Sequence, residues 1–236
     1  MGRFLYSSSC SVYGATDTEQ ILDESAEFRP VTPYAKSKVM VEGDVSAFAD
    51  DNFHPTHLRN ATVYGVSPRL RGDLVVNNLV GWALTTGDIY LKSDGTPWRP
   101  LVHVEDVCRA FIAVLDAPVE VIHNEAFNVG RTEENFRISE VAELVHKALP
   151  ETKITYADGA GPDPRCYRVN FDKIANALPG YQPTWTVPRG IDQLVSAYRK
   201  AGLTREDLEG PRYQRVKQIK TLLDSGQLDS DLRWRS

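Results

Sequence analysis

A strand, a helix and a second strand follow one another early in the sequence, and this order constrains the fold most. The apolar run Arg3–Ser9 ends in hydroxyls, which is typical of a short buried strand whose carboxyl end reaches a site. After Pro33, which suits a first helical turn, apolar residues recur at helical spacing up to about Asp51. The run His54–Tyr64 predicts a second strand, closed by Gly65. This order indicates a parallel α/β sheet.

The remaining segments alternate less regularly between helix and strand. We expect helices at residues 75–86, 104–115 and 138–149, short strands at 88–91, 99–103, 126–129 and 153–156, a polar stretch over 15–32, a turn at 94–97, a loop at 158–164, and a mostly helical, charged tail after Pro188. The whole chain therefore predicts an α/β protein.

Composition excludes several classes of function. Lys and Arg number 27 against 32 Asp and Glu, a formal net charge of −5, and the basic residues are scattered, so we expect no nucleic-acid and no membrane partner. No apolar run approaches the roughly 20 residues that a membrane-spanning helix needs. Cys10, Cys108 and Cys166 are too widely spaced for a disulfide framework or a CxxC metal site, so we expect reduced thiols and no metal. Because the amino terminus has no extended apolar signal region, we expect a cytoplasmic protein.

Tyr34 and Lys38 stand four positions apart in the expected helix, so both side chains project from one face. A nearby ammonium lowers the pKa of a phenol, which otherwise lies near 10, and lets it exchange protons near neutral pH. The same lysine could hydrogen-bond a ribose. The pattern alone also fits an exposed tyrosine beside a solvated lysine.

Five segments together carry a family resemblance. In order and spacing they resemble the extended short-chain dehydrogenase/reductases, the NAD-dependent nucleotide-sugar epimerases and dehydratases that include UDP-galactose 4-epimerase-like proteins. The segments are residues 7–14 (SSSCSVYG), 33–38 (PYAKSK), 58–65 (LRNATVYG), 99–107 (RPLVHVEDV) and 126–130 (AFNVG). The resemblance implies an α/β fold, the C-terminal portion of a Rossmann-type parallel sheet with an interleaved smaller α/β substrate-binding domain. Residues 1–65 would form the partial Rossmann domain and 66–236 mainly the substrate-binding domain, with about 99–130 returning to the Rossmann sheet.

The resemblance also implies roles in catalysis and cofactor binding. Ser9 would hydrogen-bond the reacting sugar oxygen, Tyr34 would be the acid/base, and Lys38 would bind the cofactor ribose and tune Tyr34. Ser7 and Val63, with Tyr34 and Lys38, would contact the cofactor, NAD or NADP. A strand-end hydroxyl such as that of Ser9 also commonly satisfies a nearby backbone group.

Implied substrate contacts fall further along the chain. Asn78 and Arg99 correspond to residues that contact the substrate diphosphate, for which a guanidinium fork is well suited. As alternatives, Asn78 caps a helix or is exposed, and Arg99 is solvated. An arginine that the family carries in a late loop is replaced by Ala160, and Arg165 or Arg168 would substitute for it.

Other positions depart from the family pattern or favour a structural role. Thr62 stands where the family usually has asparagine, so a substrate or nicotinamide contact there would differ. Cys10 and Ser11 occupy the places of the Asp-Glu pair of family dehydratases, which disfavours dehydration and leaves epimerisation or net redox change. We expect Cys10 to point into the core from its strand. His103 and Asp106 are expected to be structural, Asp106 as a helix cap.

No Gly-x-Gly-x-x-Gly or Gly-x-x-Gly-x-x-Gly turn, which holds the cofactor pyrophosphate in this family, is found among the 16 glycines. The resemblance implies that about four strands with their crossovers, on the order of 100 residues, precede this chain in a complete member. The alternative is a truncated, non-catalytic nucleotide-sugar-binding or structural protein. In-frame DNA upstream of Met1 that encodes a Gly-rich strand and helix would distinguish the enzyme from the truncated protein.

Without that turn, the 236-residue chain is expected to bind NAD much more weakly than a family member that has it. The cofactor pyrophosphate would lack the helix N-terminus that binds it in such a family member. Calorimetry with NAD tests this, and micromolar binding would contradict it.

The expected partners are a nucleotide-sugar substrate and a second copy of the chain. A half-sheet leaves strand edge and apolar surface exposed, and the family counterpart of the 33–51 helix packs across a dimer interface. We therefore expect a homodimer or self-association.

Overall fold

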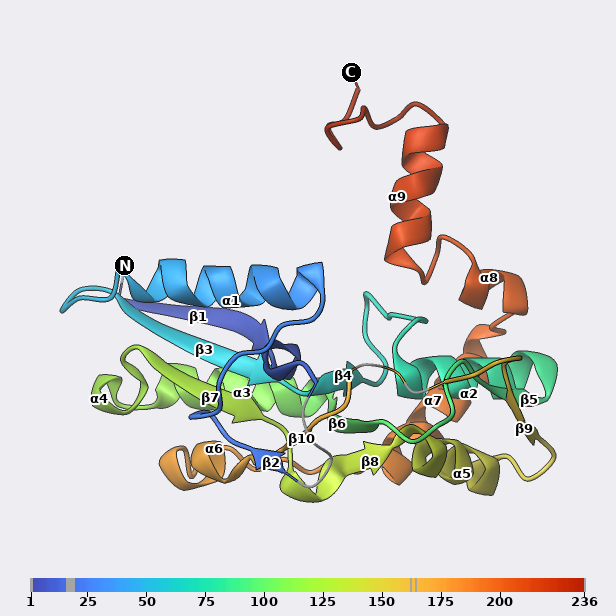
Figure 1. Ribbon diagram of the computed structural model, residues 1–236, viewed down its shortest axis with the longest axis horizontal. Helices are drawn as coiled ribbons and strands as arrows, with labels where there is room; N and C mark the ends of the chain where they lie inside the picture. The colour runs from blue at the N-terminus through green and yellow to red at the C-terminus, as the bar shows by residue number, and fades with distance from the viewer. Residues whose placement is uncertain (1, 16–19, 162, 164, 236) are drawn as a thin grey trace.

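The computed structural model describes residues 2–15, 20–161, 163 and 165–235, so parts of the predicted 15–32 stretch and 158–164 loop lie outside the described residues. A three-stranded parallel sheet has the order β1 (Arg3–Ser9), β3 (His54–Asn60) and β7 (Glu125–Val129). Its register brings Ser9 beside Asn60 and Asn60 beside Val129, so these strand ends meet at one edge of the sheet. The predicted parallel α/β sheet is confirmed (Figure 1).

Helices cover both faces of the central strand β3, and its side chains point alternately toward one face and the other. Leu58 points into a core formed with α3 (Val104–Asp116), α4 (Val119–Ile122) and α6 (Asp172–Ala177). His57 and Arg59 point the other way, toward α1 (Pro33–Ser46), where His57 contacts Ser46. Burial on both faces explains why this strand lacks a polar, solvent-facing side.

The α1 face of β3 holds a buried ion pair. The Arg59 guanidinium donates to both Glu42 carboxylate oxygens, at 3.1 and 2.8 Å, and both side chains are almost fully buried. Ser8 donates to the same carboxylate, and Arg59 also donates to the Tyr13 hydroxyl at 3.2 Å. This network ties α1 to β1 and β3 and so fixes the helix relative to the strand ends.

The rest of the chain builds a second core beside the sheet. Its strands are β4 (Thr62–Tyr64), β6 (Trp98–His103) and β8 (Asn135–Arg137) in one sheet, and β5 (Asp88–Leu91) with β9 (Lys153–Tyr156). The helices α2 (Val75–Thr86), α5 (Ile138–Ala148) and α7 (Val187–Ala201) pack together around it. The pair of β2 (Ile21–Leu22) with β10 (Arg168–Val169) belongs to a separate, smaller core with Cys10 and Tyr13. The helices α2, α5 and α7 lie to the right of β4 and β6 in Figure 1, and α1 lies to their left.

Three local predictions were wrong. The predicted 54–64 strand is two strands: Ala61 still donates to Val129 at 3.0 Å, but Thr62–Tyr64 then pairs with β6 instead of β7. Cys10 is in the core, but in a short 3-10 helix, η1 (Cys10–Tyr13), because the Ser9 hydroxyl accepts from the Ser11 amide and turns the chain. The 33–51 helix ends at Ser46.

The roles expected for His103 and Asp106 are partly exchanged. The His103 ring caps α3 by accepting from the Glu105 amide at 3.2 Å. Asp106 is not the cap. It is buried and accepts from the amides of Thr184 and Trp185, both at 3.0 Å, which joins α3 to the segment before α7.

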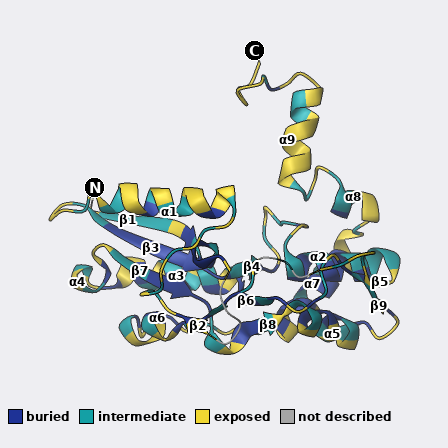
Figure 2. Cartoon of the chain, in the orientation of Figure 1, coloured by how far each residue is buried: buried dark blue, intermediate teal, exposed yellow. Residues whose placement is uncertain are grey.

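The C-terminal segment is helical, as expected. It contains α8 (Arg205–Glu209), which packs on α2, and α9 (Arg215–Asp224), which projects from the body with no buried residue (Figures 1 and 2). Within the described part of the chain, none of the helices combines the length and apolar character needed to cross a bilayer.

Candidate active site

A cavity of about 1110 Å³ lies where the ends of β1, β3 and β4 meet the loop 66–74, the start of α2 and the loop around Asp163. Its wall contains eight of the nine residues predicted for catalysis and binding, namely Ser7, Ser9, Tyr34, Thr62, Val63, Asn78, Arg99 and Arg165. The ninth, Lys38, does not line the cavity, but its Nζ donates to the carbonyl of Ser7 in the wall. The fold therefore brings together residues that are far apart in sequence.

Ser9 and Tyr34 reach the cavity through two local structures. The Ser9 hydroxyl sits at the strand end and accepts from the Ser11 amide at 3.2 Å, so it serves the backbone as well as facing the cavity. Thr32 caps α1 by accepting from the Ala35 amide at 3.1 Å, and Pro33 occupies the first turn. Tyr34 thus stands at the start of the helix with its side chain 56% exposed, free to meet a ligand.

Lys38 lies one turn after Tyr34 and is partly buried. Its Nζ donates to the Ser7 carbonyl at 2.7 Å and lies 4.7 Å from the Tyr6 ring centroid and 5.5 Å from that of Tyr34. Burial lowers the pKa of Lys38 below its ordinary value, with the charge of Glu42 opposing that shift. A partly desolvated ammonium acts more strongly on charge that develops nearby.

Arg99 and Arg165 share one carboxylate. Arg99, only 7% exposed, pairs with Asp163 at 3.0 Å and donates to the carbonyls of Trp98 and Arg165. Arg165 also pairs with Asp163, at 2.6 Å. Burial would raise the pKa of Asp163, but hydrogen bonds from Arg165 and the charge of Arg99 hold it below its usual range. A bound phosphate would compete with this carboxylate for both guanidinium groups.

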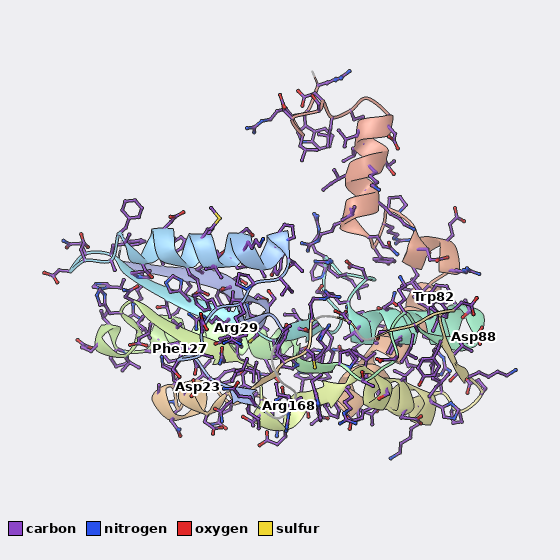
Figure 3. All side chains as sticks on the ribbon, in the orientation of Figure 1. Asp23, Arg29, Trp82, Asp88, Phe127 and Arg168 are labelled. Carbon is purple, nitrogen blue, oxygen red and sulfur yellow. The ribbon has the colours of Figure 1, made fainter. Side chains whose placement is uncertain are left out.

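Arg168, the other proposed substitute for the missing loop arginine, takes no part in the cavity wall. It lies on β10 (Figure 3). Its guanidinium is 4.7 Å from the Trp98 ring centroid. Of the two candidates, only Arg165 faces the cavity.

Asn78 holds the loop 66–74, which lines one side of the cavity. Its Nδ2 donates to the Gly72 carbonyl at 2.8 Å, and the neighbouring Asn77 donates to the Arg71 carbonyl at 3.0 Å and accepts from the Gly65 amide at 3.0 Å. Gly65 has φ of 109°, and a Cβ there would lie 2.3 Å from the His103 ring. The amide of Asn78 that the family resemblance assigns to the diphosphate is therefore engaged by the loop.

Sequence reasoning missed several charged residues of this wall. They are Arg69, Arg71, Asp73, Lys92, Asp163 and Arg215. The only signal for them was the charged Arg71-Gly72-Asp73 triplet in the loop after Gly65. Among the described residues, no group of three or more His, Cys, Asp or Glu side chains is placed to hold a metal ion.

Comparisons with known proteins agree with this architecture. The model of the NAD dependent epimerase/dehydratase family matches residues 1–130. A dTDP-glucose 4,6-dehydratase of Actinoplanes is 30% identical over 205 residues, covering 84% of this chain and 61% of that protein. A UDP-glucose 4-epimerase of Erwinia amylovora is 24% identical, covering 83% and 61%. The crystal structure of a dTDP-glucose 4,6-dehydratase from Bacillus anthracis in complex with NAD has a TM-score of 0.74 at 25% identity, covering 87% and 64%.

The sheet, its helices and these structural similarities define a partial Rossmann-type α/β protein. The chain belongs to the NAD dependent epimerase/dehydratase family, whose model matches more than half of it. It spans about three fifths of the length of the curated relatives it matches.

Proposed function

We propose that the chain carries the catalytic and substrate-binding part of an NAD(P)-dependent enzyme that epimerises, or oxidises and reduces, the sugar of a nucleotide sugar. The observation that carries this proposal is the shared cavity: Ser9, Tyr34, Arg99 and Arg165 line one wall, and Lys38 donates to a carbonyl of that wall. A hydroxyl, a phenol and a lysine suit proton exchange at a sugar hydroxyl. The arginines suit a diphosphate.

The residues present fit the nicotinamide-ribose end of a cofactor. Lys38 and Tyr34 would hold the ribose, and Ser7 and Val63 line the adjoining wall. When bound, NAD or NADP would supply the hydride acceptor. The phosphate-binding glycine turn is not among the 236 residues. Binding of the whole cofactor would then require that part from elsewhere.

In the proposed chemistry, Ser9 orients the reacting sugar hydroxyl and Tyr34 takes up its proton. The Lys38 ammonium stabilises the Tyr34 tyrosinate that accepts this proton, so that the transfer leaves Tyr34 as the neutral phenol. Arg99 and Arg165 exchange Asp163 for the diphosphate and so fix the sugar relative to Tyr34. Return of the proton from Tyr34 completes the cycle.

The two relatives described above are named for different reactions, one for a dehydration and the other for an epimerisation. The residues of this chain must therefore distinguish the two reaction types. Elimination of water needs a general acid and a general base, which family dehydratases supply as an Asp-Glu pair. The Cys10 thiol at the corresponding place is buried, which raises its pKa well above the ordinary value despite the charge of Arg59. The described carboxylates of the cavity, Asp73 and Asp163, are paired with arginines and have lowered pKa values. This supports epimerisation or net redox change over dehydration.

The test combines turnover and binding. The chain, extended by any in-frame upstream coding sequence that restores the glycine turn, is incubated with NAD and UDP- or dTDP-sugars, and the products are separated by chromatography. We expect an epimer or an oxidised sugar. A deoxy-keto sugar would overturn the preference against dehydration. Binding without turnover would favour the alternative, a non-catalytic nucleotide-sugar-binding protein.

Removing the guanidinium of Arg99 should chiefly weaken substrate binding. Arg99→Ala deletes a charge-assisted contact to the diphosphate, worth about 1.5–3 kcal/mol, with less effect on the chemical step. Calorimetry with UDP-glucose measures the loss. Arg168→Ala is the matched control, because Arg168 lies outside the cavity wall. Equal affinities for the two variants would contradict the role of Arg99.

Self-association is expected from two exposed features. Among the described residues β1 pairs only with β3, and α1 exposes Met40 at 67%. We propose that a second copy covers this side. Light scattering of the purified chain at micromolar concentration should show a dimer or larger species. A monomer would contradict the proposal.

A further inference from the structure

Two segments far apart in sequence, the loop 66–74 and the C-terminal segment 210–215, share one side of the cavity. They are joined by the Gly72 amide, which donates to the Tyr213 carbonyl at 3.0 Å. The buried Leu208 of α8 packs beside this contact, where a Cβ at Gly72 would lie 3.1 Å from its side chain and one at Gly81 2.7 Å. The absence of side chains at both glycines lets α8 approach α2 and the loop this closely.

The Gly72 peptide is held from both sides. Its amide donates to Tyr213, and its carbonyl accepts from Asn78 of α2 at 2.8 Å. The flanking residues, Arg71 and Asp73, form a two-point ion pair, with both contacts at 2.6 Å. Loop, α2 and C-terminal segment therefore form one connected unit, and the charges of the loop occupy fixed positions on the cavity wall.

Arg215, the first residue of α9, adds a further cation to this wall. Burial would raise the pKa of Asp73, but hydrogen bonds from Arg71 and the charges of Arg71 and Arg215 lower it. Arg215 lines the same cavity as the Arg71–Asp73 pair. No ion pair within 4.0 Å involves Arg215 in the part of the chain that the structure describes. Its guanidinium is therefore available to an anion that enters the cavity.

We propose that Arg215 is a substrate-binding residue, which contacts the anionic part of the nucleotide sugar and thereby strengthens the existing connection between the start of α9 and the loop 66–74 when substrate binds. This inference rests on the proposed function, because it assumes a phosphorylated ligand in the cavity. It assigns a binding role to a C-terminal segment that otherwise projects from the body (Figure 2). Substrate binding and the order of this segment are then coupled.

The experiment compares Arg215→Gln with Lys220→Gln by calorimetry. Lys220 is an exposed cation on the same helix that takes no part in the cavity wall, so both variants lose one charge. Arg215→Gln should weaken UDP-glucose binding about tenfold, as expected for one charge-assisted contact, while Lys220→Gln should change it by less than about twofold. Uridine, which has no phosphate, should bind both variants alike. Thermal melting checks that each variant is folded.

Hydrogen exchange supplies the second measurement. Amides of residues 210–224 should exchange more slowly when UDP-glucose is added to the unmodified chain and to Lys220→Gln, but not when it is added to Arg215→Gln. Equal affinities of the two variants, or protection that survives in Arg215→Gln, would overturn the role of Arg215 while leaving the proposed function intact. If neither UDP-glucose nor dTDP-glucose binds the unmodified chain, the proposed function itself fails.

Discussion

Replacing Tyr34 by phenylalanine is expected to lower kcat by about 10²- to 10⁴-fold in the enzyme with a complete NAD site, with little change in nucleotide-sugar binding. The ring and its contacts survive and only the hydroxyl is lost. Tyr34 is largely exposed at the first turn of α1, and α1 is capped by Thr32, so loss of the Tyr34 hydroxyl leaves the fold intact. Steady-state kinetics and calorimetry separate the two effects.

Two controls make this result specific. Tyr90 lines the same cavity, and Tyr90→Phe should keep most of the turnover because no role in proton exchange is proposed for it. Lys38→Met should lower both kcat and cofactor affinity, whereas Lys36→Met, on the exposed side of the same helix, should lower neither. Near-normal turnover of Tyr34→Phe would overturn the catalytic assignment and favour a binding protein.

Sequence patterns predicted the order of elements well because most of them carry their own local signals. The strand Arg3–Ser9 and the helix Val75–Thr86 have the expected bounds. The break at Ala61 could not be predicted, because no glycine or proline interrupts the segment between Pro55 and Gly65, and only the exchange of partner strand, from β7 to β6, divides it. The turn at Cys10 similarly depends on one hydrogen bond from the Ser11 amide to Ser9.

The residues of the cavity wall also fall into two groups, those with a local signal in the sequence and those without one. Residues that the family motifs contain, such as Ser9 and Tyr34, were predicted, and the fold places them together. The counter-ions of the arginines were not predicted. Asp163 reaches Arg99 from a separate loop, and a pairing across such a distance in sequence leaves no periodic or local pattern. Arg215 belongs to a charged tail whose pattern is typical of a solvated helix.

The largest expected effect on stability comes from the buried pair of Glu42 and Arg59. Glu42→Gln keeps the shape of the side chain but leaves the Arg59 charge buried without a counter-ion. Such a loss typically costs about 3–5 kcal/mol of unfolding free energy. Glu27 and Arg29 form an ion pair at 3.1 Å that is largely exposed, so Glu27→Gln should cost no more than about 1 kcal/mol. Urea denaturation of the two variants gives the comparison.

A double-mutant cycle identifies the cause of the Glu42 effect. Arg59→Met removes the buried cation, so adding Glu42→Gln to Arg59→Met should cost much less than Glu42→Gln alone. Because the Ser8 hydroxyl donates to Glu42 at the end of β1, the network joins the stability of α1 to the strand that carries the Ser9 hydroxyl. If the free-energy costs of the two substitutions simply add, Glu42 acts through packing or through Ser8. The ion pair would then not be what holds α1 against the strand ends, and with α1 the side chains of Tyr34 and Lys38.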